Sequence, residues 1–293
     1  MNDVLKVFVF LGIILFILAG VATMFFLFGG MVLSGDSIAV IDMSGEISEA
    51  GPISAALMRE MLNDVAEDGS VVAVVLKINS GGGGVIETKE IARQVSKLSE
   101  SKPVIAYIGD MGASGAYYVA AFSDYIMSDE DSLIGSIGVI STYMSYQGLL
   151  EDKLGINTTV IKSGIYKDIG SPYKQMTDDE KTILQGIVDQ VHTEFLEVII
   201  SRRSLTKDAI AIVNTSDIFL GSRALQLGLI DYTGGFEDAL SLARDVAGSP
   251  DAEPYYLDAS SYYSGDMYYN IGKGVGDALA SKIALNGESL AFK

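Results

Sequence analysis

The chain of 293 residues lacks cysteine altogether and has a single histidine, His192. Without cysteine no disulfide bond can form. Zinc sites are built mainly from cysteine and histidine, so a zinc centre is not expected either. No other metal or cofactor motif stands out, and the sequence predicts a protein that works with no cofactor.

Positive charge is also scarce. The chain has 20 Lys and Arg against 38 Asp and Glu, for a formal net charge of −18. Such a chain repels the phosphate backbone, so we expect no nucleic-acid partner. The acidic surface equally disfavours direct docking on anionic lipid, and it is sufficient to keep a folded domain soluble.

One long segment contains no charge of either sign. Residues 7–34 are rich in Phe, Leu, Ile and Val. A bilayer-spanning helix needs about 20 apolar residues, whereas the apolar part of a cleaved signal peptide has about 7–15. Residues 19–22 are the best cleavage point for that alternative. The nearest basic residue, Lys6, precedes the run. The sequence therefore predicts a single-pass anchor in the cell membrane, with the large domain on the extracytoplasmic side.

Three regions follow from composition. Residues 1–36 form the predicted anchor, and residues 37–250 form the main domain. Residues 251–293 form an extension with paired tyrosines. We expect this extension to pack on the domain or on a neighbouring subunit, since tyrosine is enriched at interfaces, and to include a helix over 268–283.

Hydrophobic periodicity in the main domain predicts strands alternating with helices. The predicted strands are 37–43, 71–78, 104–108, 124–128, 138–143 and 157–162. The predicted helices are 53–66, 85–98, 116–122, 144–154 and 177–204. Such alternation favours an α/β fold with a parallel sheet and crossover helices.

A lone serine, Ser114, lies among small residues in the segment 112–118, where a predicted strand passes into a predicted helix. A serine there can face a substrate, and the N–H groups of the helix N-terminus can stabilise negative charge. Acyl transfer needs both features. The alternative is that the small residues only permit close packing of the helix on the sheet.

Two further loops carry candidate groups. Residues 79–84 read Asn-Ser-Gly-Gly-Gly-Gly, which frees backbone N–H groups to face a ligand. No Gly-Lys-Ser/Thr follows, so a phosphate loop is disfavoured. The loop 162–172, bounded by glycine and proline, presents Lys167. Alone, either loop could be an ordinary solvated turn.

Together, in order and spacing, these segments resemble the signal peptide peptidase A family of serine proteases, in its short single-domain form. The resemblance covers residues 37–248. The family's nucleophile lies in an Ala-Ser-Gly motif matched by Ser114, and its base is the lysine of a Tyr-Lys motif matched by Lys167. A Gly-Ser-Ile-Gly motif matches 135–138, which implies that Ser136 holds the lysine. Gly81 replaces a family proline.

The resemblance implies a Clp protease/crotonase-like fold and a ring-like homo-oligomer in which neighbouring chains could share an active site. It implies a membrane-anchored serine endopeptidase that degrades signal peptides left after cleavage of preproteins, with apolar peptides as substrates. Three alternatives stay open: a protease acting on a stomatin-like partner, a crotonase-like acyl-CoA enzyme, and an inactive peptide-binding scaffold.

The chemistry of a Ser–Lys pair makes specific demands. His192 lies within a predicted helix, so the base is expected to be Lys167, whose amine must be neutral to accept a proton. An apolar surrounding favours that neutral form. We therefore expect the neighbouring Asp168 to point away from Lys167. The oxyanion donors are expected to be backbone N–H groups of Gly83 and Gly115, with Gly82 as a further candidate.

Overall fold

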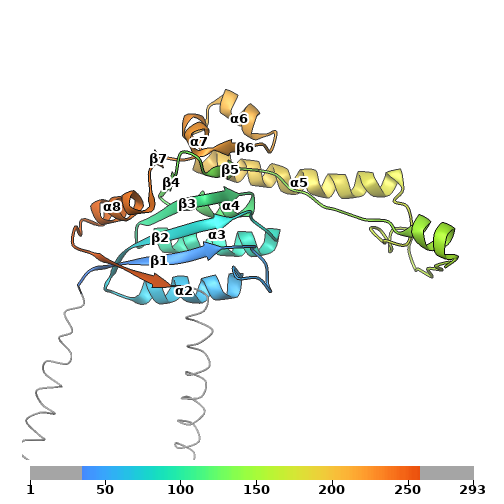
Figure 1. Cartoon of the computed structure of the whole chain (residues 1–293), viewed down its shortest axis with the longest axis horizontal. Coiled ribbons are helices and arrows are strands. Elements are labelled where there is room, and N and C mark those ends of the chain that lie inside the picture. Colours follow the sequence, from blue (N-terminus) through green and yellow to red (C-terminus); the bar gives the residue numbers. More distant parts are fainter. Residues whose placement is uncertain (1–34, 258–293) are drawn as a thin grey trace, which may run out of the picture.

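The computed structural model describes residues 35–257, which form a β-sheet with helices on both faces (Figure 1). Three long strands occupy its centre: β1 (Ser37–Ser44), β2 (Val71–Ser80) and β3 (Val104–Ala113). They pair in parallel. The crossover helices are α2 (Ala55–Glu67) and α3 (Val85–Ser99). The strand–helix alternation predicted from the sequence is confirmed here.

Short strands complete the sheet. They are β4 (Tyr125–Ser128), β5 (Leu133–Gly135), β6 (Ile218–Leu220), β7 (Tyr232–Thr233) and β8 (Glu253–Leu257). The order is β6-β5-β3-β2-β1-β8, with β4 paired to β3 and β7. Of the pairings between described strands, only β5 with β6 is antiparallel. The fold is therefore a mixed α/β sheet, and the prediction of a parallel sheet with crossover helices is corrected at that edge.

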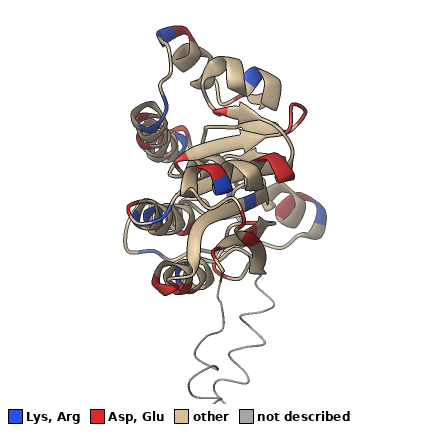
Figure 2. Ribbon diagram, turned by 90° about the vertical axis from the view of Figure 1, so that its left-hand side faces the viewer, with Lys and Arg blue, Asp and Glu red and all other residues tan. Residues whose placement is uncertain are grey.

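The two faces of the sheet are covered unequally. The larger buried cluster lies between the sheet and α2, α3 and the short α4 (Gly115–Ala120). The smaller one is covered by α8 (Phe236–Ala247). Charged residues gather on the helices and loops around the sheet (Figure 2). The central strands are buried on both faces, as their nearly continuous apolar sequences require.

A long helix, α5 (Asp178–Arg202), follows as the sequence predicts. Thr177 and Glu180 form a capping box at its start. At its other end Arg203 binds both carboxylate oxygens of Asp231, at 3.1 and 2.7 Å. Two short helices, α6 (Lys207–Val213) and α7 (Gly221–Leu227), lead on to that aspartate. These contacts fix α5 to the body of the domain.

The segment between β5 and α5 differs from its prediction. Residues 138–143 and 157–162 are not strands. Of the helix predicted over 144–154 only residues 147–154 are helical, mostly as a short π-helix, η1 (Leu149–Lys153). Residues 139–176, here called the arm, project from the body (Figure 1). The two segments have β-branched residues, but a strand needs a neighbouring strand to satisfy its backbone, and among residues 35–257 they find none.

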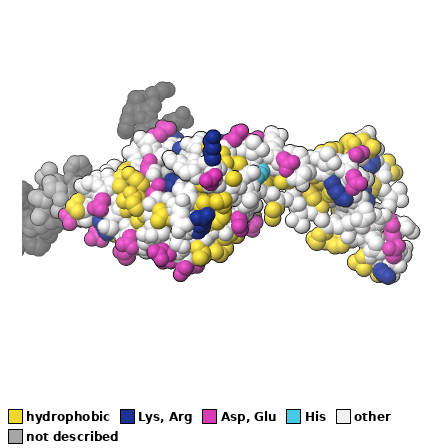
Figure 3. Space-filling view, turned by 90° about the horizontal axis from the view of Figure 1, so that it is seen from above, with side chains coloured by type: hydrophobic (Ala, Val, Ile, Leu, Met, Phe, Trp, Pro, Cys, Tyr) yellow, Lys and Arg dark blue, Asp and Glu magenta, His cyan; other side chains and the backbone are white. Residues whose placement is uncertain are grey.

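The arm exposes apolar side chains. Ile140 and Ile161 are 91% and 96% exposed. Seen from above, hydrophobic side chains also gather at its far end (Figure 3). A surface of this kind usually marks an interaction site.

The predicted anchor lies outside the described residues except for 35–36, and so does the helix expected over 268–283. Within residues 35–257, no helix has both the length and the apolar character needed to cross a bilayer.

Candidate active site

Ser114 stands at the junction of β3 and α4 in an unusual backbone conformation, with φ 53° and ψ −124°. Its N–H donates to the Gly135 carbonyl at 2.8 Å, and its carbonyl accepts from the Tyr118 N–H at 3.0 Å. Holding a non-glycine residue at such angles costs about 1–3 kcal/mol, and such strain clusters at active sites. The surrounding hydrogen bonds keep the strained conformation in place.

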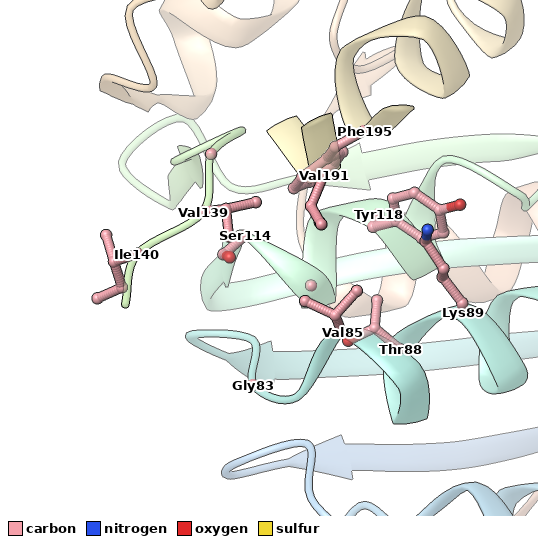
Figure 4. A pocket seen from close by; sticks show the side chains of 12 residues that line it. Gly83, Val85, Thr88, Lys89, Ser114, Tyr118, Val139, Ile140, Val191 and Phe195 are labelled. Carbon is pink, nitrogen blue, oxygen red and sulfur yellow. The ribbon is translucent and has the colours of Figure 1, made fainter. Parts of the chain in front are cut away.

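The Ser114 side chain faces a cavity of about 90 Å³ (Figure 4). Helix α3 contributes Val85 and Thr88 to its lining, and α5 contributes Val191 and Phe195. Val139 and Ile140 line it on the side of Ser114 (Figure 4). Most of these groups are apolar, so the cavity suits an apolar side chain beside the serine.

The glycine loop packs directly against this serine. A Cβ atom on Gly82, whose φ is +93°, would lie 2.6 Å from the Gly115 nitrogen and 3.0 Å from the Ser114 Cβ. Only glycine can therefore occupy position 82. On its other side the loop is held by Ile47, whose N–H donates to the Gly82 carbonyl at 3.0 Å and whose carbonyl accepts from the Gly84 N–H at 2.8 Å.

This packing distinguishes the predicted oxyanion donors. The Gly82 N–H already donates to Ser80 Oγ at 3.1 Å. Gly83 and Gly115 adjoin, since a Cβ atom on Gly115 would lie 3.4 Å from the Gly83 nitrogen. Gly115 is the first residue of α4, where N–H groups have no intrahelical acceptor. The geometry thus favours Gly83 and Gly115 over Gly82.

Ser136 lies close to the nucleophile along the backbone. It follows Gly135, whose carbonyl accepts from Ser114, and Gly138 already lines the cavity. Ser136 has a φ of 48°, and its N–H donates to the Asp217 carbonyl at 2.8 Å. The structure therefore brings Ser114 and the Ser136 segment together.

The structure does not place Lys167 with Ser114 and Ser136. It lies in the arm, exposed, and is not part of the cavity lining. Asp168 bonds Lys162 and Lys174, at 2.6 and 2.9 Å. Its carboxylate is thus committed to two other lysines, whereas the sequence predicted only that it points away from Lys167. His192, on α5, does not line the cavity either.

A different lysine, Lys89, does reach the cavity, and sequence reasoning missed it. Its amine is bound to Glu194 at 2.6 Å, at the end of the cavity away from Ser114 (Figure 4). An amine engaged in an ion pair is a hydrogen-bond donor and not a proton acceptor. Its partner is 105 positions away in the chain, so no local motif could have revealed it.

A strained serine beside two backbone N–H groups and an apolar cavity has the geometry of a serine hydrolase that works by acyl transfer. Comparison with known proteins makes this more specific. Residues 96–249 match the family model described as peptidase family S49.

Relatives match over most of the chain. A provisionally named protease of Methanocaldococcus jannaschii is 40% identical over 232 residues, which is 78% of this chain and 74% of that protein. A provisionally named signal peptide peptidase SppA of Enterococcus faecium is 34% identical over 71% of this chain and 62% of its own length. A solved membrane-bound stomatin-specific protease shares the fold, with a TM-score of 0.50 and 14% identity over 76% of this chain and 98% of its own.

The chain therefore belongs to peptidase family S49, the signal peptide peptidase A family, and is a serine endopeptidase.

Proposed function

We propose that this protein is a membrane-anchored endopeptidase that degrades residual signal peptides, with Ser114 as nucleophile and Lys167 of a neighbouring subunit as base. One observation carries the proposal: the cavity that holds Ser114 does not include Lys167, which lies exposed on the projecting arm of the same chain. A second copy, placing its arm over this cavity, would supply the missing amine.

In the proposed reaction Ser114 Oγ attacks the peptide carbonyl and its proton passes to the neutral amine of Lys167. The Gly83 and Gly115 N–H groups stabilise the oxyanion. The C–N bond then breaks, and the leaving amine takes the proton from the Lys167 ammonium. The Lys167 amine, neutral again, then deprotonates a water molecule, which hydrolyses the ester and restores Ser114. Ser136 orients the lysine as a third group does in related dyads.

The exposed arm supports a homo-oligomer. Its apolar side chains, including Ile161 at 96% exposure, would be covered by a neighbouring copy. Its two segments rich in β-branched residues, 138–143 and 157–162, would then find strand partners. A ring of such contacts would repeat one heterologous interface around an axis.

The apolar cavity supports apolar peptides as substrates, and a relative named as a signal peptide peptidase points to the same class. A stomatin-like partner is the second candidate, favoured only by the name of a structure that shares the fold. Membership of a peptidase family leaves no reason to retain the acyl-CoA enzyme or the inactive scaffold.

The remaining expectations are part of the proposal. Residues 1–36 anchor the chain in the cell membrane, the peptidase domain of 37–250 lies on the extracytoplasmic side, and its sheet is of the Clp protease/crotonase type. Residues 251–293 extend from it, and the first of them include β8, which pairs with β1.

Mixing two inactive variants tests the shared site. Ser114→Ala and Lys167→Ala should each abolish cleavage of a synthetic signal peptide. Subunits mixed under exchange conditions should regain about a quarter of wild-type activity, since half of the serines and half of the facing lysines are intact. Ser114→Ala mixed with the double variant is the control and should stay inactive. An inactive first mixture beside an active wild type would contradict the shared site.

A further inference from the structure

Two cavities meet at a common wall. The cavity of about 90 Å³ beside Ser114 and a groove of about 620 Å³ between α3 and α5 are both lined by Lys89 and Tyr118. In the close view these two side chains lie together at the end of the cavity away from Ser114 (Figure 4). They are what separates the small cavity from the larger groove.

The wall is held from both helices. Lys89 Nζ on α3 donates to Glu194 Oε2 on α5 at 2.6 Å. The other oxygen of Glu194 accepts from Gln190 Nε2 at 3.2 Å. Tyr118 is 8% exposed and meets the Phe195 ring edge-on, with the ring centres 5.1 Å apart. Contacts with α5 therefore hold both side chains in position.

The charge at the wall is balanced. The hydrogen bond from Lys89, followed by that from Gln190, holds the pKa of the Glu194 carboxyl below its ordinary value. The carboxylate is thus ionised at neutral pH and neutralises the ammonium. An apolar side chain that reaches the wall meets a satisfied ion pair and not a bare charge.

The geometry points to a specificity device: Lys89, held by its ion pair with Glu194, closes the end of the substrate side-chain pocket away from Ser114 and limits the length of the side chain that precedes the cleaved bond. This inference rests on the proposed function. A dry protein cavity of about 150 Å³ holds benzene, so a cavity of 90 Å³ suits an aliphatic side chain and excludes an aromatic one.

Two substitutions separate the bulk of this wall from its charge balance. Lys89→Ala removes its bulk and joins the cavity to the groove, so that a longer side chain can enter. Glu194→Gln keeps the shape and leaves the ammonium of Lys89 without its counter-charge. The first change should admit aromatic side chains, and the second should favour acidic ones.

The test uses full-length protein in detergent and peptides that differ only in the residue before the cleaved bond: Val, Leu, Phe or Glu. The wild type should cleave the Leu peptide with a kcat/KM about 10-fold or more above that for Phe. Lys89→Ala should raise the ratio of Phe to Leu about 10-fold. Lys97→Ala, exposed on the same helix and outside both cavities, is the matched control and should leave the ratio unchanged.

The outcomes are distinguishable. An unchanged ratio of kcat/KM for Phe to Leu in Lys89→Ala, with the Leu peptide still cleaved, overturns the specificity role of Lys89 but leaves the proposed function standing. Loss of all cleavage in Lys89→Ala, with the fold intact, would make Lys89 the base and overturn both proposals. If Lys89→Ala fails to fold, Glu194→Gln decides: a rise of about 10-fold in kcat/KM for the Glu peptide supports the wall, and no rise overturns it. A wild type that cleaves none of the peptides overturns the proposed function and the wall with it.

Discussion

Asp168 and Lys174 form an ion pair in the arm, with 2.9 Å between Oδ1 and Nζ. The same oxygen accepts from Lys162 at 2.6 Å, and Lys174 also bonds the buried Glu180 in the first turn of α5. A chain of charges therefore fastens the loop that carries Lys167 to the start of the long helix. Hydrogen bonds from Lys162 and then Lys174 hold the pKa of Asp168 at about 2.

Removing the Asp168 carboxylate should disturb the placement of Lys167. We expect Asp168→Asn to lower kcat/KM about 10-fold or more, because small misplacements of a catalytic group are costly. Steady-state cleavage of a signal peptide measures the effect. Asp178→Asn is the control, because the Asp178 side chain is 99% exposed and, among the residues that the structure describes, it pairs with Lys181 alone. Equal losses in the two variants would contradict a positioning role for Asp168.

The same carboxylate predicts a pH dependence. Its pKa in the folded protein is lowered from 3.8 to about 2, so its stabilising effect is complete above pH 4 and is lost as the pH falls through 2. Hydrogen exchange of residues 162–174, corrected for intrinsic rates, should be slower in the wild type than in Asp168→Asn at pH 6. The two proteins should converge toward pH 2. A difference that persists at pH 2 would assign the protection to another group.

The strained backbone of Ser114 predicts an order of stabilities. Glycine adopts positive φ without strain, whereas alanine keeps the strain of the native serine. Ser114→Gly should therefore be more stable than Ser114→Ala by about 1 kcal/mol, as measured by denaturant unfolding, although both lack activity. If the alanine variant proves the more stable, strain at Ser114 is not stored in the backbone.

Ser136 is expected to orient the base. Ser136→Ala should lower kcat by about 10–1,000-fold, with KM nearly unchanged. This is less than the roughly 100–10,000-fold that an acid–base group itself contributes, because Ser136 acts through the lysine. Labelling of Ser114 by a fluorophosphonate should slow in parallel, because the same base activates the serine in both reactions. Unchanged labelling and turnover would leave Ser136 as a structural residue of its loop.

The exposed arm predicts that peptide cleavage depends on oligomerisation. Ile161→Asp places a charge on a side chain that is 96% exposed in the single chain, and a neighbouring copy should bury it. Burying an unpaired charge is strongly unfavourable, so the oligomer should dissociate and cleavage should be lost together. Sedimentation velocity and peptide cleavage measure the two effects. Val246→Asp, on α8, makes the same change on the body of the domain and should alter neither.

The central sheet was predictable because its signals are local and long. Residues 71–78 and 104–108 are apolar runs, and each belongs to a strand of ten residues. Strands of two or three residues, such as β5 and β7, carry no pattern that periodicity can detect. The predicted strands at 138–143 and 157–162 failed for another reason: their β-branched residues favour a strand, but strand formation depends on a neighbouring strand, and the described part of the chain provides none for them.

The residues of the candidate site also differ in how clearly the sequence marks them. Ser114 and the glycine loop are recognisable because each motif is contiguous, and the sheet brings β2 and β3 together in parallel. Lys89 gave no such signal, since its role depends on Glu194 and on the packing of α3 beside α5. For Asp168 the sequence predicted only that its side chain points away from Lys167, and its ion pairs with Lys162 and Lys174 were not predicted.

Because Lys167 lies outside the cavity that holds Ser114 in the same chain, the proposed assembly also determines when a subunit becomes active. On the proposed assembly, a newly synthesised subunit carries a nucleophile that no base activates, and it stays latent until it meets other copies. Specific activity should then fall on dilution and recover on concentration. A cell that makes few copies would hold an idle enzyme, so abundance itself would act as the switch that turns proteolysis on.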